Sequence, residues 1–177
     1  MQGHLLPALE AIPQSSQDQY TAKRQEISFL LNDFLLKYLN TLYVEFNGDF
    51  VLAIVLGELA HQNVCQFARQ GRMELPRTEL PVSVDALRNF LLPCNPFSIS
   101  ESTGIPRETV RRKFEELVRL GLIERISPRE YIITSLAAER FMFGLNLRIF
   151  EGINILCTHL KTLLDNGSAH VAGNDSD

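Results

Sequence analysis

A single glycine turn constrains this chain more than any other feature of the sequence. Gly104 follows a short helix-like segment and precedes Ile105-Pro106, where a second helix is expected to begin. Ile99 and the small Ser100 lie five and four residues before the glycine. A small residue at that point lets two helices cross closely, glycine accepts a tight turn, and proline fits the first turn of a helix. The pattern predicts two short helices that meet at a tight turn.

The second helix is expected to be amphipathic and to end at Leu120-Gly121. Its apolar residues recur at steps of three and four, which places them on one inward face. These residues are Val110, Phe114 and Leu117, with Val118 beside them.

Two strand-like segments follow, Leu122–Ile126 and Tyr131–Thr134, and Ser127–Glu130 joins them as a four-residue turn. Two short helices that meet at a glycine turn form the helix-turn-helix pattern, and the two strands add a small wing. We therefore expect a winged helix-turn-helix within residues 82–134.

Basic residues collect at the start of the second helix. From Pro106 to Lys113 there are four basic residues and one acidic residue, a local balance of +3. The N-terminal end of a recognition helix reaches base edges in the major groove. Arginine suits paired contacts with guanine and also binds phosphate. Arg125 and Arg129 flank the expected hairpin, and Arg129 at its turn is expected to contact the DNA backbone.

A solvated helix face is the other interpretation of these charges. Glu108 and Arg112, like Arg111 and Glu115, lie four residues apart and can pair on a helix surface. The net charge of the chain, −4, also weighs mildly against nucleic-acid binding. We favour DNA contact because the arginines cluster at the contacting end of a recognisable motif. A winged helix that serves only as a protein-interaction module is the alternative function.

The run TGIPRETVRRKFEELVRLGLIER, residues 103–125, resembles the winged helix-turn-helix of bacterial transcription regulators of the MarR, GntR and IclR families. The resemblance covers about 45 of the 177 residues. It implies sequence-specific binding of double-stranded DNA and regulation of transcription. By position it implies DNA contact from Arg107, Glu108, Thr109, Arg111 and Arg112.

Two departures leave the subfamily open. The GntR family places this domain at the N-terminus, whereas about 80 helical residues precede it here. The MarR family has helices on both sides of the motif, which fits, but its wing is longer than Ser127–Glu130 allows.

Long helices are expected on both sides of the motif. They cover about Thr21–Phe46, Phe50–Gln70 and Ser135–Leu164, and a shorter helix is expected over Ser83–Leu92. The start of the second, Phe50–Leu56, is apolar all round, which is typical of a helix buried on every side. The last has a wide apolar stripe that includes Ile149 and Leu156. Because long terminal helices in a small chain commonly pair with another copy, we expect a homodimer.

The expected fold is all-α with a small two-stranded wing, in which long N- and C-terminal dimerisation helices flank the winged helix-turn-helix. The segments are a flexible arm (1–18), a helical dimerisation or regulatory segment (19–72), the DNA-binding domain (82–134), a dimerisation helix (135–165) and a disordered tail (166–177). Residues 72–81, with two prolines, read as a linker.

Nothing in the sequence indicates catalysis, a cofactor or a metal. Three widely spaced cysteines form no CxxC pair, which argues against a zinc site and fits a reducing cytoplasm. Glu58 and His61 make one Glu-x-x-His, whereas di-iron bundles use two, so we interpret them as a polar patch. The longest apolar run, Phe50–Gly57, is too short to span a bilayer, and we expect no signal peptide and no membrane partner.

A small-molecule effector of unknown identity is possible for a regulator of this kind. Phe141, Phe143 and Phe150 could line a pocket with Leu145, but we favour packing in the core or at an interface for them. The sequence indicates neither the operator nor the sign of regulation.

Overall fold

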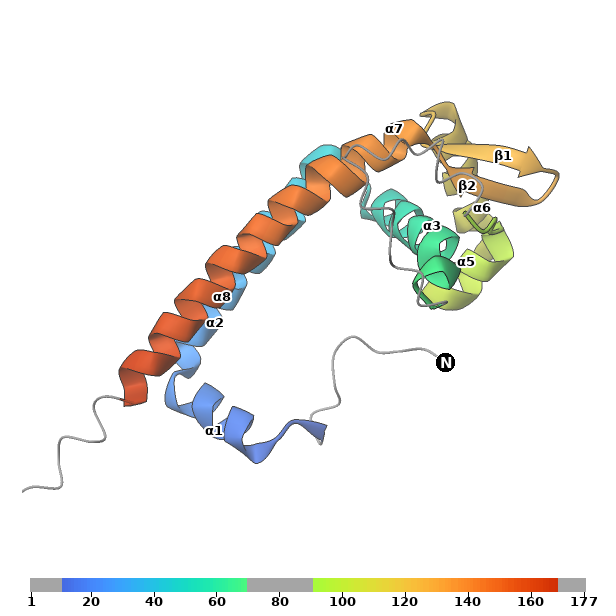
Figure 1. Ribbon diagram of the computed structural model, residues 1–177. Helices are drawn as coiled ribbons and strands as arrows, with labels where there is room; N and C mark the ends of the chain where they lie inside the picture. The colour runs from blue at the N-terminus through green and yellow to red at the C-terminus, as the bar shows by residue number, and fades with distance from the viewer. Residues whose placement is uncertain (1–10, 70–90, 169–177) are drawn as a thin grey trace, which may run out of the picture. The chain divides into compact units, whose positions relative to one another are not determined.

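The computed structural model describes residues 11–69 and 91–168, and its mostly helical chain carries a small antiparallel sheet (Figure 1). In chain order the described elements are α1 (Gln14–Ala22), α2 (Arg24–Glu45), α3 (Phe50–Arg69), α5 (Pro96–Thr103), α6 (Arg107–Arg119), β1 (Ile123–Ser127), β2 (Glu130–Ile133), α7 (Ser135–Ala137), the π-helix η3 (Ala138–Leu145) and α8 (Asn146–Ser168). The described residues form two compact units, 11–41 with 147–168, and 42–69 with 91–146.

Helix α3 is the centre of the 42–146 unit, and α5, α6 and β2 all pack against it. Val55 and Leu59 of α3 are fully buried, as are Ile99 of α5 and Val110 of α6. Burying a side chain of this size stabilises the fold by about 1.5–3 kcal/mol. The apolar start of α3 is nevertheless not buried on every side, because Ile54 is 52% exposed.

Strands β1 and β2 form a hairpin within one residue of the predicted bounds. Ile123 pairs with Ile133, and the register is irregular between Arg125 and Ser127. Cys94 extends this sheet through an isolated bridge: its N–H donates to the Tyr131 carbonyl over 3.1 Å and its carbonyl accepts from the Tyr131 N–H over 2.9 Å. The segment before α5 is therefore bonded to β2.

A buried amide joins the hairpin to α3. The side chain of Asn63 has no exposed surface, and its Oδ1 accepts from the Ile133 N–H over 2.9 Å. Its Nδ2 donates to the Leu92 carbonyl over 2.6 Å and to the Tyr131 carbonyl over 3.4 Å. The backbone of the same residue accepts from the Leu92 N–H. One side chain thus bonds β2 and the 92–94 segment to a single helix.

The long helix predicted over Thr21–Phe46 is two helices. The chain breaks at Lys23, and α1 begins at Gln14, inside the segment expected to be a loose arm. Local polar bonds support α1: Gln14 donates to Asp18, four residues later, and the Thr21 hydroxyl to the Gln17 carbonyl. The Gln14–Asp18 pair, four residues apart, is of the kind that stabilises a helix without buried residues.

The last predicted helix is interrupted as well. Thr134 caps α7 by accepting from the Ala137 N–H, while its hydroxyl donates to the Gly121 carbonyl over 2.7 Å. A π-helical stretch follows before α8, which runs to Ser168 and includes the first residues of the expected tail. The predicted 83–92 helix and the 72–81 linker lie outside the described residues, except that Leu91 and Leu92 are not helical.

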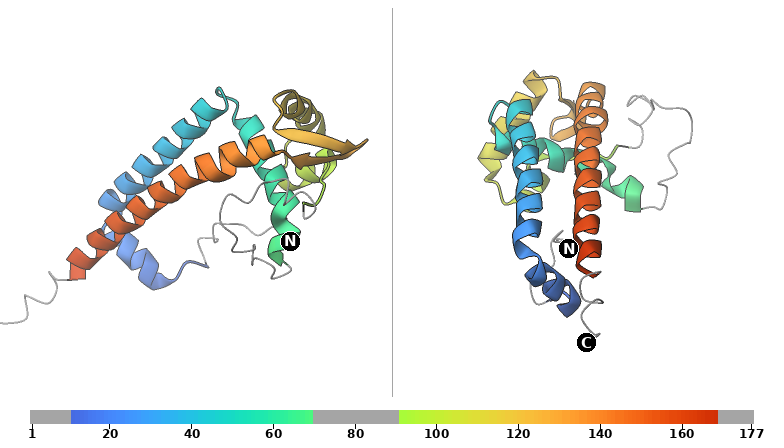
Figure 2. Two further views of the ribbon diagram at one scale, coloured as in Figure 1. Left: turned by 45° about the horizontal axis from the view of Figure 1, so that its top comes forward. Right: turned by 90° about the vertical axis from the view of Figure 1, so that its left-hand side faces the viewer.

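In the other unit, α2 and α8 run antiparallel side by side (Figure 2). The Phe34 ring of α2 packs against Gly152 of α8, where an added Cβ would lie 3.2 Å from the ring. Ile149 and Leu156, expected at a dimer interface, are half-buried along this contact.

Replacing Asn63 with leucine is expected to lower the free energy of unfolding by about 2–4 kcal/mol. The change leaves the Ile133 N–H and the Leu92 carbonyl buried without their partner. Urea unfolding followed by circular dichroism measures the loss. The matched control is Gln62→Leu, because Gln62 bonds the side chains of Ser98 and the exposed Ser102; its expected loss is below about 1 kcal/mol. Equal losses in the two variants would contradict this account of the core.

Candidate nucleic-acid interface

The turn between α5 and α6 is built as its sequence predicts. Gly104 has a φ of 71°, and its N–H donates to the Ser100 carbonyl over 2.9 Å. Ser100 has a second role that its size alone did not indicate, since its hydroxyl donates to the Ile105 carbonyl over 2.8 Å. Asn95 caps α5 by accepting from the N–H groups of Phe97 and Ser98. These bonds set the position from which α6 begins.

Three of the four apolar residues assigned to the inner face of α6 are buried: Val110, Phe114 and Leu117. The fourth assignment is wrong, because Val118 is 42% exposed. Each residue turns 100° about a helix axis, so Val118 lies beside Arg111 on the flank rather than beneath the helix. The inward stripe of α6 is therefore narrow, and most of its surface faces solvent.

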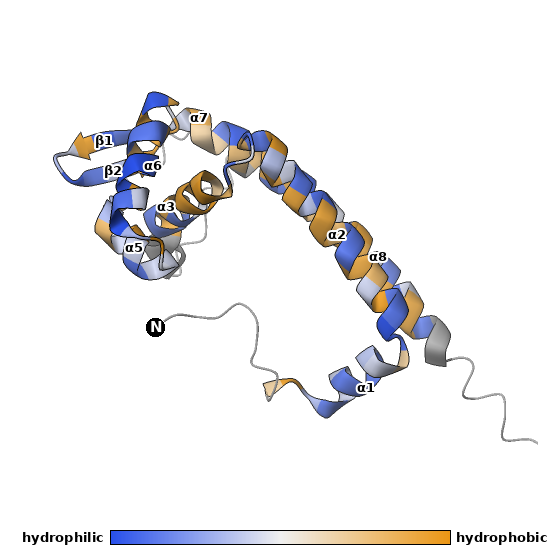
Figure 3. Ribbon diagram, turned by 180° about the vertical axis from the view of Figure 1, so that it is seen from behind, coloured by the Kyte–Doolittle hydropathy of each residue, from blue (hydrophilic) through white to orange (hydrophobic). Residues whose placement is uncertain are grey.

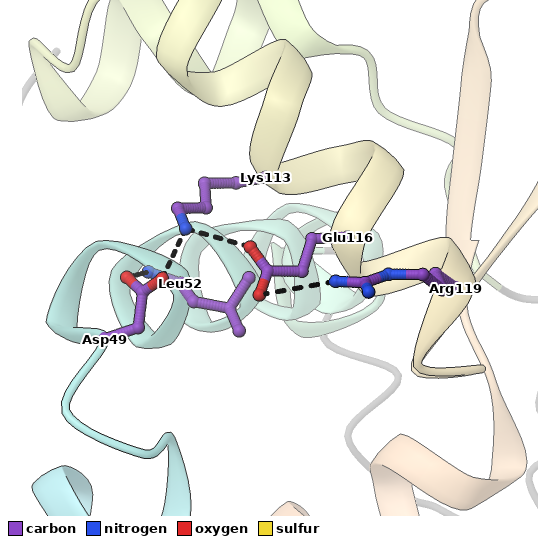
Figure 4. A network of polar contacts seen from close by, with 5 residues as sticks. All are labelled: Asp49, Leu52, Lys113, Glu116 and Arg119. Atoms are coloured by element: carbon purple, nitrogen blue, oxygen red, sulfur yellow. Dashed lines mark hydrogen bonds and ion pairs between the residues drawn. The ribbon is translucent and has the colours of Figure 1, made fainter.

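A charged network holds α6 against the start of α3 (Figure 4). Lys113 of α6 forms an ion pair with Asp49 and another with Glu116 at 2.9 Å. The second oxygen of Asp49 caps α3 by accepting from the Leu52 N–H over 2.8 Å. Glu116 also lies 3.9 Å from Arg119. The charge of Lys113 is engaged in these structural ion pairs and is not available to a ligand.

Opposing influences act on the pKa of Asp49. Partial burial acts to raise it, but the hydrogen bond and charge of Lys113, with backbone N–H groups of Leu52 and Val51, hold the pKa below the ordinary value of 3.8. The hydrogen bonds to Asp49 and Glu116 raise the pKa of Lys113 above 10.5. Both groups therefore stay charged across the neutral range.

Arg111 is held by acidic neighbours. Its Nε and one terminal nitrogen donate to the two oxygens of Glu108 at 3.0 and 2.7 Å, and it also pairs with Glu115. The hydrogen bond from Arg111 lowers the pKa of Glu108, and the two carboxylates raise the pKa of Arg111. The predicted Arg111–Glu115 pair is present. Glu108, however, pairs with Arg111, three residues along the helix, and not with Arg112. Within the described residues Arg112 makes no ion pair.

Two further arginines lie against aromatic rings. The Arg107 guanidinium is 5.6 Å from the ring centroid of Phe97, which is 54% exposed. The Arg125 guanidinium is 6.0 Å from the ring of Tyr131 and donates to the carbonyls of Ser127 and Pro128 in the hairpin turn. Neither contact neutralises the charge of its arginine, so both positive charges remain open to an anion.

The start of α6 and the β1–β2 hairpin enclose a hollow of about 570 Å³. Among the residues predicted to contact DNA, Arg107, Arg111 and Arg129 line it, and Arg125 and Phe97 line it with them. Glu108, Thr109 and Arg112 do not line the hollow; Glu108 and Arg112 are exposed and Thr109 is half-buried. Phe97 was not predicted, although a large apolar residue directly after a capping Asn-Pro pair was a visible signal.

Other chemistry is sparse in the part of the chain that the structure describes. Burial raises the pKa of the Cys94 thiol to about 12, so this thiol is not a nucleophile at neutral pH. No group of three His, Cys, Asp or Glu side chains is placed to hold a metal ion within residues 11–69 and 91–168. No helix in the same ranges is long and apolar enough to cross a membrane.

Comparison with family models, curated proteins and solved structures found no match for this chain. Its function is therefore argued from the geometry of the described residues.

Replacing Asp49 with asparagine tests the network that holds α6. Asparagine keeps a cap for α3 but removes the charge. The free energy of unfolding at pH 7 is therefore expected to fall by about 1 kcal/mol. Because folding lowers the pKa of Asp49, its contribution is present above pH 3.8 and is lost as pH falls through the lower folded value. The two proteins should then have equal stability near pH 2.

Urea melts over a pH series measure this difference, with Asp33→Asn as the control. Among the described residues Asp33 pairs with exposed Lys37, and its loss should be within error at every pH. A deficit of Asp49→Asn that persists at pH 2 would show that the charge pair is not its cause.

Proposed function

We propose that this protein is a sequence-specific regulator of transcription that binds double-stranded DNA through a winged helix-turn-helix and acts as a homodimer. In this proposal α5, the Gly104 turn and α6 form the helix-turn-helix, α6 is the recognition helix and the β1–β2 hairpin is the wing. The protein would act in the cytoplasm, where bacterial DNA lies.

The observation that carries the proposal is the gathering of arginines from two elements around one hollow. Arg107 and Arg111 come from the start of α6, and Arg125 and Arg129 come from the hairpin. Glu115 is the acidic residue among the lining side chains, and it already pairs with Arg111. A concave surface lined by several arginines favours a polyanion such as the sugar-phosphate backbone.

The surroundings of each residue suggest a division of tasks. Arg112 lies on the solvent face of α6 without an ion pair among the described residues, and we assign base contact to it. Thr109 and Glu108 in the first turn are proposed to bind phosphate and a cytosine amine, respectively. Arg129 makes no hydrogen bond or ion pair within the described residues and is assigned to the DNA backbone. Arg107 is placed to reach either partner.

A protein-interaction module is the second candidate, and one observation favours it. The exposed side of α6 alternates in sign: Glu108 and Glu115 each pair with Arg111 between them. Such a surface suits a protein partner with mixed charges as well as it suits a polyanion. A gel shift with duplex DNA at increasing salt separates the two candidates, since binding to phosphates weakens steeply with salt.

Single alanine substitutions test the assigned tasks once the preferred sites have been selected from random duplex DNA. Arg112→Ala is expected to weaken the selected site by about 1–3 kcal/mol and random DNA by less, because it removes a base contact. Arg129→Ala should weaken all sequences alike and lower the salt slope by about one unit, since it removes a phosphate contact.

The matched control is Arg119→Ala at the opposite end of α6. Arg119 is 77% exposed and lies far along the helix from its N-terminal turn, so its removal should leave affinity unchanged. If a folded protein with Arg107, Arg111 and Arg112 all replaced by alanine binds its DNA as before, the proposal is wrong and the protein-interaction function takes its place.

A homodimer presents two recognition helices to one face of the duplex. The selected sites should then be inverted repeats whose half-sites lie about one helical turn apart, roughly 34 Å. Sequencing the selected pool shows the repeat, and mass measurement of the complex gives the number of chains per duplex. A non-repeating site bound by one chain would contradict the dimeric arrangement.

A further inference from the structure

Helices α2 and α8 pack as an antiparallel pair, which we call the α2–α8 hairpin. The pair has two long sides that differ in polarity. One side holds a hollow of about 210 Å³ with a polar rim that includes Asp33, Lys37, Arg148 and His159. Asp33 and Lys37 form an ion pair of 2.8 Å on this rim. The opposite side has large apolar residues instead, and Figure 3 shows hydrophobic residues recurring along both helices.

The apolar residues of that opposite side share one face by helical geometry. On α2 they recur at steps of four, and on α8 at steps of three and four, so each set forms a single stripe. Because the helices are antiparallel, the stripes turned away from the hollow lie on the same side of the hairpin (Figure 2). We call this set the apolar face; it comprises Leu31, Leu35, Leu39, Phe150, Ile153 and Cys157.

The apolar face is large for a surface that stays in water. Phe150 is 60% exposed, and Leu36, which flanks the face on α2, is 67% exposed. At about 100 Å² for each large side chain, the face with Leu36 offers roughly 600 Å² for burial. The smaller stable protein interfaces bury about 600 Å² on each partner, so the face is matched in size to one such interface.

The charges around the face identify its occupant. Over residues 11–41 and 147–168 there are five basic and five acidic side chains, a balance of zero. A helix pair that lies on an anionic membrane carries an excess of lysine and arginine beside its apolar stripe, and this pair has none. An apolar stripe with balanced charge around it is complementary to a stripe of the same kind, which the same face of a second copy supplies.

We propose that the apolar face is the dimer interface, and that two α2–α8 hairpins pack face to face about a twofold axis as a four-helix arrangement. The proposal is independent of DNA binding. It also changes which residues are expected at the interface. Ile149 and Leu156 lie along the contact between α2 and α8 of one chain, and the residues that contact the partner lie on the adjacent stripe of α8.

Two isoleucines of α8 provide a matched test. Ile153 lies on the apolar face and is 41% exposed, whereas Ile155 lines the hollow on the other side and is 49% exposed. In the absence of DNA, light scattering of the full chain at micromolar concentration should give twice the chain mass of 20.1 kDa. Ile153→Glu should give the single-chain mass, because it places a charge in the interface, and Ile155→Glu should remain a dimer.

Circular dichroism of both variants keeps the test independent of folding. Each isoleucine is partly exposed in one chain, so a monomeric Ile153→Glu should keep the helical signal of a folded protein. A monomeric native chain, a dimer that survives Ile153→Glu, or a dimer that only Ile155→Glu dissociates would each overturn the proposal. Because no DNA is present, none of these outcomes is produced by a failure of DNA binding.

Discussion

The side chain of Asn63 sets the place of the β1–β2 hairpin, because its two polar atoms together bond β2 at two residues and the segment before α5. Apolar packing alone lets neighbouring elements slide, since it has no direction. Hydrogen bonds to the Ile133 N–H and to the carbonyls of Leu92 and Tyr131 have direction, and in a buried site each is costly to lose. The hairpin is thereby fixed against α3 rather than merely resting on it.

The opposite end of α3 fixes α6 through charge. Asp49 caps the helix and pairs with Lys113, so one carboxylate ends the α2–α3 turn and anchors α6 at the same time. The two elements that carry the arginines are each tied to α3, one by an amide and one by an ion pair. Both elements therefore take their positions from one helix, and Phe114 of α6 also packs edge-on against Tyr131 of β2.

Local patterns in the sequence predicted those parts of the unit that local forces determine. The Gly104 turn, the burial of Val110, Phe114 and Leu117, and the bounds of the hairpin follow from steric limits and periodicity within a few residues. Val118 was assigned wrongly because periodicity predicts the direction of the buried stripe and not its width. A stripe that includes Val118 has the same periodicity as one that does not. How much of a helix is covered depends on its neighbours in space.

Such local patterns could not predict hydrogen-bond partners that lie far apart in the sequence. Asn63 and Ile133 are 70 residues apart, and no spacing in the sequence links them. The break at Lys23 has no glycine or proline beside it, and the π-helical turns from 138 to 145 begin without one, since Gly144 lies near their end. For the candidate site, the arginine cluster was predicted, whereas Phe97 and the pairing of Glu108 with Arg111 were found only in the structure.

The clasp of Arg111 between Glu108 and Glu115 has a consequence for discrimination between ligands. The two carboxylates present oxygen acceptors much as a phosphodiester does, so the chain carries its own competitor for this guanidinium. A ligand that engages Arg111 must replace these hydrogen bonds one for one, and the exchange adds little to overall affinity. A ligand without an acceptor at that place leaves the clasp closed and faces its net single negative charge. Arg111 would therefore act through rejection of the wrong partner more than through attraction of the right one.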